Sequence, residues 1–61
     1  MKVYVVNCYA FDEDRNLYCD FMGTEGVWSD KYHAKQWVVQ QTLKDKENGD
    51  DCMYDIKEFN L

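Results

Sequence analysis

Hydrophobic residues occupy both alternating sets of positions along residues 3–11. One set contains Val3, Val5, Tyr9 and Phe11, and the other contains Tyr4, Val6, Cys8 and Ala10. Val, Tyr and Phe are enriched in strands. Two apolar faces are typical of a strand in the middle of a sheet, since edge strands carry more charge. The pattern therefore predicts a central β-strand over residues 3–11.

Five polar residues follow and end in Asn16, which suits the left-handed conformation found at the end of many turns. The apolar pattern resumes over residues 17–23 and predicts the second strand of a β-hairpin. A four-residue turn would place Cys8 opposite Cys19, on the same face as Phe21.

A helix is predicted for residues 30–47, which are rich in Lys, Gln, Ala and Leu. Residues 24–28 would be the connector that leads to it. Either Ser29 or Asp30 suits the N-cap, and Gly49 suits the left-handed position after the last turn. The sequence thus places one helix directly after the hairpin.

Residues 52–59 alternate again and predict a third strand. A helix that crosses the sheet antiparallel to strand 2 lets strand 3 run parallel to strand 2. The favoured right-handed crossover then places strand 1 between them. We therefore expect an α+β fold over residues 1–61: one β-β-α-β domain with an antiparallel-type sheet of order 2-1-3 and one helix on one face.

Too many apolar side chains are present for one helix to cover. Because it can cover one sheet face, either the set with Val3, Val5, Tyr9, Phe11, Tyr18 and Met22 or the set with Tyr4, Val6, Ala10 and Phe21 must stay open. An open apolar stripe of this kind indicates an interaction surface. On the helix, Trp37 or Tyr32 is expected to point outward as an anchor, since Trp and Tyr are enriched at binding hot spots.

The net charge of the chain restricts the class of partner that it can bind. Twelve Asp and Glu against seven Lys and Arg give a net charge of −5. Direct binding to nucleic acid or to an anionic membrane is disfavoured, because such binding depends on neutralising phosphates. A basic protein surface is favoured, because opposite fields speed encounter.

Metal-binding and catalytic signatures are weak. Asp12, Asp14 and Asn16 match the start of a calcium loop, but Leu17 and Gly23 stand where that loop needs Gly and Glu. No C-x-x-C pair supports a zinc site built from the three cysteines and His33, and core cysteines are the better reading. No nucleophile, base and orienting group share a local motif. We therefore expect neither an enzyme, nor a metal, nor a cofactor.

The cysteine count is odd, with Cys8, Cys19 and Cys52 far apart in the sequence. Secreted disulfide frameworks normally show an even number. The first residues lack a signal-peptide pattern, and no window reaches the length of a membrane span. These features predict a cytoplasmic protein with reduced thiols.

The favoured hypothesis is a small inhibitor or adaptor that docks an aromatic patch ringed by carboxylates onto a basic surface of a larger protein. The expected contact residues are Tyr9, Phe11, Tyr18, Trp37, Asp12, Glu13 and Asp14. In one form of this hypothesis, the protein occupies the nucleic-acid-binding groove of its partner, with Asp and Glu in place of phosphates. In general character the chain resembles phage-encoded inhibitors of host machinery, which are also very small, acidic and without motifs. The alternatives are an obligate homo-oligomer, such as a homodimer, that buries the free sheet face, and a Cys/His metal-binding or redox module.

Overall fold

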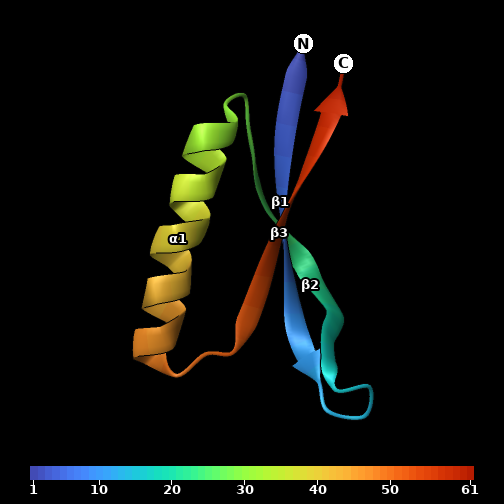
Figure 1. The fold of residues 1–61 in the computed structure, drawn as a ribbon, viewed down its shortest axis with the longest axis vertical. Coiled ribbons are helices and arrows are strands. Elements are labelled where there is room, and N and C mark those ends of the chain that lie inside the picture. Colours follow the sequence, from blue (N-terminus) through green and yellow to red (C-terminus); the bar gives the residue numbers. More distant parts are fainter.

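The hydrophobic segments form three strands and one helix in the computed structural model, which describes residues 1–61. Their order is β1 (Lys2–Asp12), β2 (Leu17–Trp28), α1 (Lys31–Asn48) and β3 (Cys52–Asn60). The strands pair antiparallel in the order β2-β1-β3, with α1 beside the sheet (Figure 1). The predicted α+β fold with a central first strand is confirmed.

A tight turn joins β1 to β2. The Asp12 Oδ1 atom accepts hydrogen bonds from the backbone N–H groups of Asp14 at 3.0 Å and Arg15 at 3.4 Å. Asn16 ends the turn in the left-handed region, with φ of 57°. Its short polar side chain tolerates this conformation. The Asp12 carboxylate thus has a structural role in closing the hairpin.

Strand β2 is longer than predicted, because residues 24–28 continue the strand instead of forming a connector. Its pairing with β1 shifts register at three places and leaves an unpaired residue at each, namely Cys19, Met22 and Glu25. Such bulges bend a strand and increase its twist. Gly26 is required near the end of the strand, because a Cβ atom there would lie 2.8 Å from the Trp28 ring.

The bulges also overturn two predicted positions. Cys8 lies opposite Gly23 on β2, not opposite Cys19. Phe21 lies opposite Tyr9, so it belongs to the other face from Cys8. A regular two-residue period predicted both positions wrongly, because each inserted residue shifts the pairing by one.

Helix α1 has the expected ends. Asp30 is the N-cap, and its Oδ1 atom accepts a hydrogen bond from the backbone N–H of Tyr32 at 2.8 Å. Gly49 ends the helix with φ of 78°, and its N–H bonds back to the last turn. A left-handed residue at this position satisfies carbonyl groups that would otherwise lack partners.

The helix covers the sheet face that carries Val6 and Cys8. Val6 and Ala34 are fully buried there, and Cys8 is 4% exposed. Only four of the 61 residues are buried, so the core is very small even for a chain of this length. Figure 1 shows the twisted sheet nearly edge-on, with α1 along one side and no element along the other.

Trp37 joins the helix to the sheet. Its ring lies 5.5 Å from the rings of both Trp28 and Tyr54, measured between centroids. In the last turn of α1, Asp45 accepts hydrogen bonds from Gln41 Nε2 at 2.9 Å and from the Tyr54 hydroxyl. Burial, followed by this bond to Asp45, raises the pKa of Tyr54 above its ordinary value. One aromatic stack and one polar cluster therefore hold α1 to β2 and β3.

Candidate partner-binding face

The sheet face turned away from α1 is uncovered and largely apolar. The odd-numbered residues of β1 lie on it, together with the residues paired to them on β2 and β3. Nine of these are apolar or aromatic: Val3, Val5, Tyr9, Phe11, Tyr18, Phe21, Val27, Met53 and Phe59. We call this surface the open face.

Five of the nine gather near the β1–β2 turn and form what we call the aromatic cluster: Tyr9, Phe11, Tyr18, Phe21 and Met53. The Tyr9 and Phe21 rings meet edge to face at 5.7 Å. The Phe11 and Tyr18 rings do so at 5.1 Å. Phe21 remains 57% exposed, and Tyr18 and Met53 are each 36% exposed. Rings that support one another yet stay exposed suit a preformed contact surface.

A polar band separates the aromatic cluster from a second apolar group. The band consists of Asn7, Thr24, Asp55 and Lys57, in which the Thr24 hydroxyl donates to Asn7 Oδ1 at 2.8 Å. One carboxylate oxygen of Asp55 is buried without any hydrogen-bond partner. Beyond the band lies this second apolar group, made of Val3, Val5, Val27 and Phe59.

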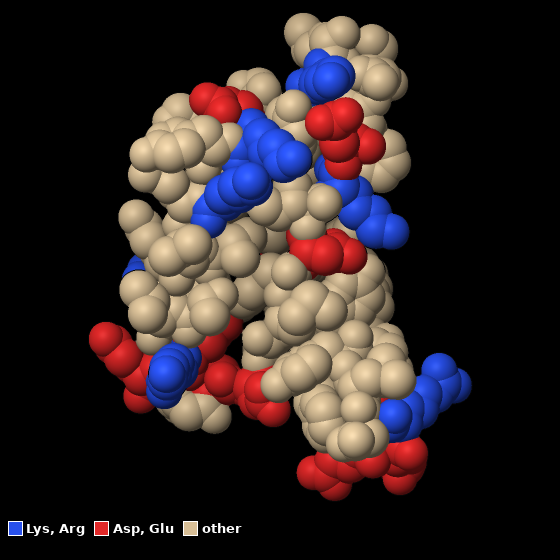
Figure 2. All heavy atoms as spheres, viewed as in Figure 1, with Lys and Arg blue, Asp and Glu red and all other residues tan.

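Net charge is concentrated at the end of the molecule that carries the aromatic cluster. Residues 12–20 and 44–51 contain eight of the twelve acidic and three of the seven basic residues, which accounts for the entire net charge of −5. The rest of the chain has four of each sign. Both segments lie at the lower end in Figures 1 and 2, where carboxylates gather on the surface. We call this the acidic end.

Tyr18 connects the aromatic cluster to the acidic end. Its hydroxyl donates a hydrogen bond to Asp51, just before β3. This bond, with smaller effects from desolvation and the Asp51 charge, raises the pKa of Tyr18. The Tyr18 hydroxyl therefore holds the Asp51 carboxylate beside the rings of the aromatic cluster.

Six of the seven residues predicted to contact a partner lie together. Tyr9, Phe11 and Tyr18 are in the aromatic cluster, and Asp12, Glu13 and Asp14 form the adjoining turn. Trp37 does not join them, because it packs against the other sheet face. Of the two helix aromatics, Tyr32 is the outward one and is 62% exposed.

Sequence reasoning missed Phe21, Met53 and Asp51 as members of this surface. Phe21 was assigned to the wrong face because the bulges are not visible in the hydrophobic pattern. Because Met53 alternates with polar residues, the sequence pattern could have shown which sheet face it occupies. Its pairing with Tyr9 makes it part of the aromatic cluster. Asp51 lies in the loop before β3, where no sequence pattern connects it to the aromatic side chains.

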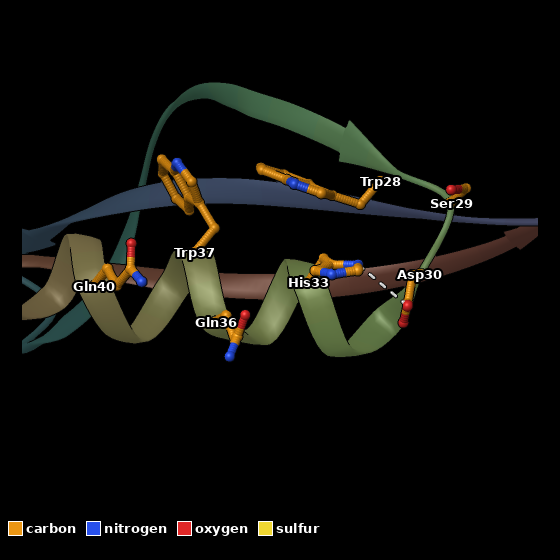
Figure 3. A pocket seen from close by; sticks show the side chains of 7 residues that line it. All are labelled: Trp28, Ser29, Asp30, His33, Gln36, Trp37 and Gln40. Carbon is orange, nitrogen blue, oxygen red and sulfur yellow. Dashed lines mark ion pairs between the residues drawn. The ribbon is translucent and has the colours of Figure 1, made fainter.

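A hollow lies beside Trp37, at the N-terminal half of the helix (Figure 3). It has a volume of about 340 Å³ and is lined by Trp28, Ser29, Asp30, His33, Gln36, Trp37 and Gln40. His33 Nδ1 lies 3.2 Å from Asp30 Oδ2. Since Asp30 also caps the helix, its two oxygens are both engaged within the protein. Helix capping therefore accounts for the Asp30 carboxylate and the His33 imidazole beside it.

The three cysteines are free thiols and do not gather with His33. No three His, Cys, Asp or Glu side chains form a group that could hold a metal ion. Cys8 and Cys52 are neighbours under the helix, whereas the Cys19 thiol lies 3.7 Å from Asp12 Oδ2 at the hairpin. Burial, and then the neighbouring Cys52, raises the pKa of Cys8 to about 11. A thiol held neutral in this way is a poor nucleophile and metal ligand.

Stability should fall as the pH rises from 9.0, the ordinary thiol pKa, to about 11. Over this range the unfolded chain releases the Cys8 proton while the folded chain keeps it, which favours unfolding. Urea unfolding at several pH values should show a smaller loss for Cys8→Ala than for the wild type. Cys19→Ala is the matched control and should keep the wild-type dependence. An unchanged dependence in Cys8→Ala would contradict this assignment.

Comparisons with known proteins add no constraint: no family profile, curated protein or solved structure matches the chain. The helix α1 is not apolar enough to cross a membrane. The candidate site is therefore defined by its geometry and charge.

Proposed function

We propose that this protein is a small inhibitor or adaptor that acts by binding, without catalysis, to a basic surface of a larger cytoplasmic protein. One observation carries the proposal. The aromatic cluster on the open face and the whole net negative charge lie at the same end of the molecule. Apolar contact and charge complementarity would thus act on the same region of a partner.

The two components have different physical effects. Burial of aromatic side chains supplies most of the free energy at typical protein interfaces, concentrated in a few hot spots. Surrounding carboxylates speed the encounter with a basic partner and repel acidic ones. Phe21 and Tyr18 would provide the apolar contact, while the acidic turn provides the field.

A nucleic-acid-binding protein is the partner class that fits best. Its groove is lined by Lys and Arg to neutralise phosphates. Carboxylates at Asp12, Glu13, Asp14 and Asp51 would occupy the positions of those phosphates, and the rings would contact the groove wall. In this form the protein competes with nucleic acid for the same groove.

Affinity capture from the source cells, with mass spectrometry as the readout, tests the proposal. Wild-type protein should enrich a basic protein that Phe21→Ala loses, since that truncation removes an exposed ring from the aromatic cluster. Tyr32→Ala is the matched control, because Tyr32 is similarly exposed on the far side of the helix. The captured protein should then be released by competing nucleic acid. Capture that survives Phe21→Ala, or that requires Tyr32 instead, would refute the proposed site.

A further inference from the structure

We propose that, when no other partner is bound, a second copy of this chain covers the open face. The two sheets would pack face to face about a two-fold axis, with their strands antiparallel and the axis at the level of Ile56. The proposal concerns the isolated protein, so it holds or fails independently of the proposed function.

The area available is sufficient for a specific dimer. Among the apolar residues of the open face, Val27 is 60% exposed, Phe21 57% and Phe59 49%. With Phe and Tyr side chains burying roughly 150–250 Å² each when fully covered, and Val and Met less, the exposed parts of the face would bury roughly 600 Å² per copy. The total of roughly 1,200 Å² lies at the lower limit for stable protein interfaces. A chain with four buried residues gains a second core from this contact.

The register of β3 makes the face self-complementary. When β3 lies antiparallel over its symmetry mate with the axis at Ile56, Met53 faces Phe59 of the second copy. On β1, which pairs in the same register, Tyr9 faces Val3 of the second copy. Two pairs thus join the aromatic cluster of one copy to the second apolar group of the other, while Val5 lies over Asn7 of the polar band. A two-fold interface requires each contact to occur twice, and this alignment satisfies that condition.

The charged residues of the polar band agree with the same alignment. Asp55 and Lys57 lie one on each side of Ile56, on the same face, and neither forms an ion pair within the chain. The alignment places each Asp55 over Lys57 of the second copy. It offers a cation to the Asp55 carboxylate, which has no ion-pair partner within the chain. Because β3 is an edge strand, both pairs would lie at the rim, where desolvation costs are small.

The antiparallel arrangement also separates the acidic ends. Each acidic end, with all of the net charge, lies over the electrically balanced end of the other copy. A parallel arrangement would bring the two acidic ends together, which is unfavourable. The alternative occupant, a basic partner, would instead be drawn to the acidic end.

Sedimentation equilibrium of the untagged protein, from micromolar to millimolar concentrations, tests the dimer. We expect a monomer–dimer equilibrium that Val27→Glu and Phe59→Glu each weaken at least about tenfold, since each buries a charge in the interface. Val39→Glu is a matched control, because Val39 is 59% exposed but lies on the outer side of α1. Circular dichroism would verify that each variant is folded.

A charge exchange tests the alignment itself. Asp55→Lys and Lys57→Asp should each weaken the dimer, because like charges then face each other across the axis. An equimolar mixture of the two single variants should form a heterodimer about as strongly as the wild type, because both opposite-charge pairs return. A general loss of stability would not be repaired by mixing.

A folded wild-type monomer at every concentration would overturn the proposal. So would a dimer that Val39→Glu disrupts and Val27→Glu leaves intact, since that dimer would use the helix. Salt separates this proposal from the proposed function. Two copies of charge −5 repel, so added salt should strengthen the dimer, whereas it should weaken binding to a basic protein.

Discussion

Trp37→Ala should destabilise the isolated protein by about 3 kcal/mol, the lower end of the usual cost of removing a core ring, because Trp37 is half-buried. The Trp37 ring contacts both Trp28 and Tyr54 and so connects the helix to two strands. Domains of this size rarely have more than about 5 kcal/mol of stability. Thermal unfolding monitored by circular dichroism should therefore show a large fall in the unfolding temperature.

Tyr32→Ala is the matched control for the effect of Trp37→Ala on stability. Tyr32 is on the same helix but 62% exposed, and exposed positions usually change stability by less than about 0.5 kcal/mol. If Trp37→Ala leaves the unfolding temperature unchanged, Trp37 is not the link between helix and sheet. It would then return as a candidate for direct contact with a partner.

Once a basic partner is identified, its binding kinetics should separate the aromatic and acidic contributions. Phe21→Ala should mainly speed dissociation and weaken binding by about 2 kcal/mol or more if the ring is a hot spot. Charge reversal at Glu13 and Asp14, whose side chains do not close the turn, should mainly slow association. Raising salt toward physiological concentration should slow the wild-type association in the same way, because it shortens the Debye length to about 8–10 Å. Surface plasmon resonance at several salt concentrations would measure these rates.

Glu25→Lys provides the control for charge. It changes the net charge by the same amount as one reversal in the turn, but Glu25 lies outside the acidic end. A larger effect from Asp14→Lys than from Glu25→Lys would locate the steering field at the acidic end. Equal effects would mean that only the overall charge matters. If salt leaves the association rate unchanged, the acidic end contributes to solubility and not to the encounter with the partner.

The fold was predictable from local signals that tertiary structure did not override. Two apolar faces marked β1 as central, and Gly49 and Asp30 marked the ends of the helix. The topology followed from chain direction and crossover handedness. Each of these signals depends on a residue and its near neighbours, which the sequence displays directly.

The candidate site was predictable only in part, because its composition depends on register. Tyr9 and Phe11 are separated by one residue on a regular strand, so their common face was evident. Phe21 reaches Tyr9 only through the bulges in β2, which arise from pairing with another strand. The orientation of Trp37 could not be predicted from the helix alone. Trp37 and Tyr32 were both candidates for the outward position, and the sheet covers only one side of the helix.

The bulges in β2 also bear on how this protein tolerates changes in length. A residue lost from an ordinary strand shifts every side chain beyond it to the opposite face. Cys19, Met22 and Glu25 have no partner on β1, so each can be deleted with the flanking pairs kept. Deletion of Met22, for example, leaves Phe21 opposite Tyr9 and Gly23 opposite Cys8, with some loss of bend. Evolution can therefore shorten this strand one residue at a time without exchanging its open and covered faces.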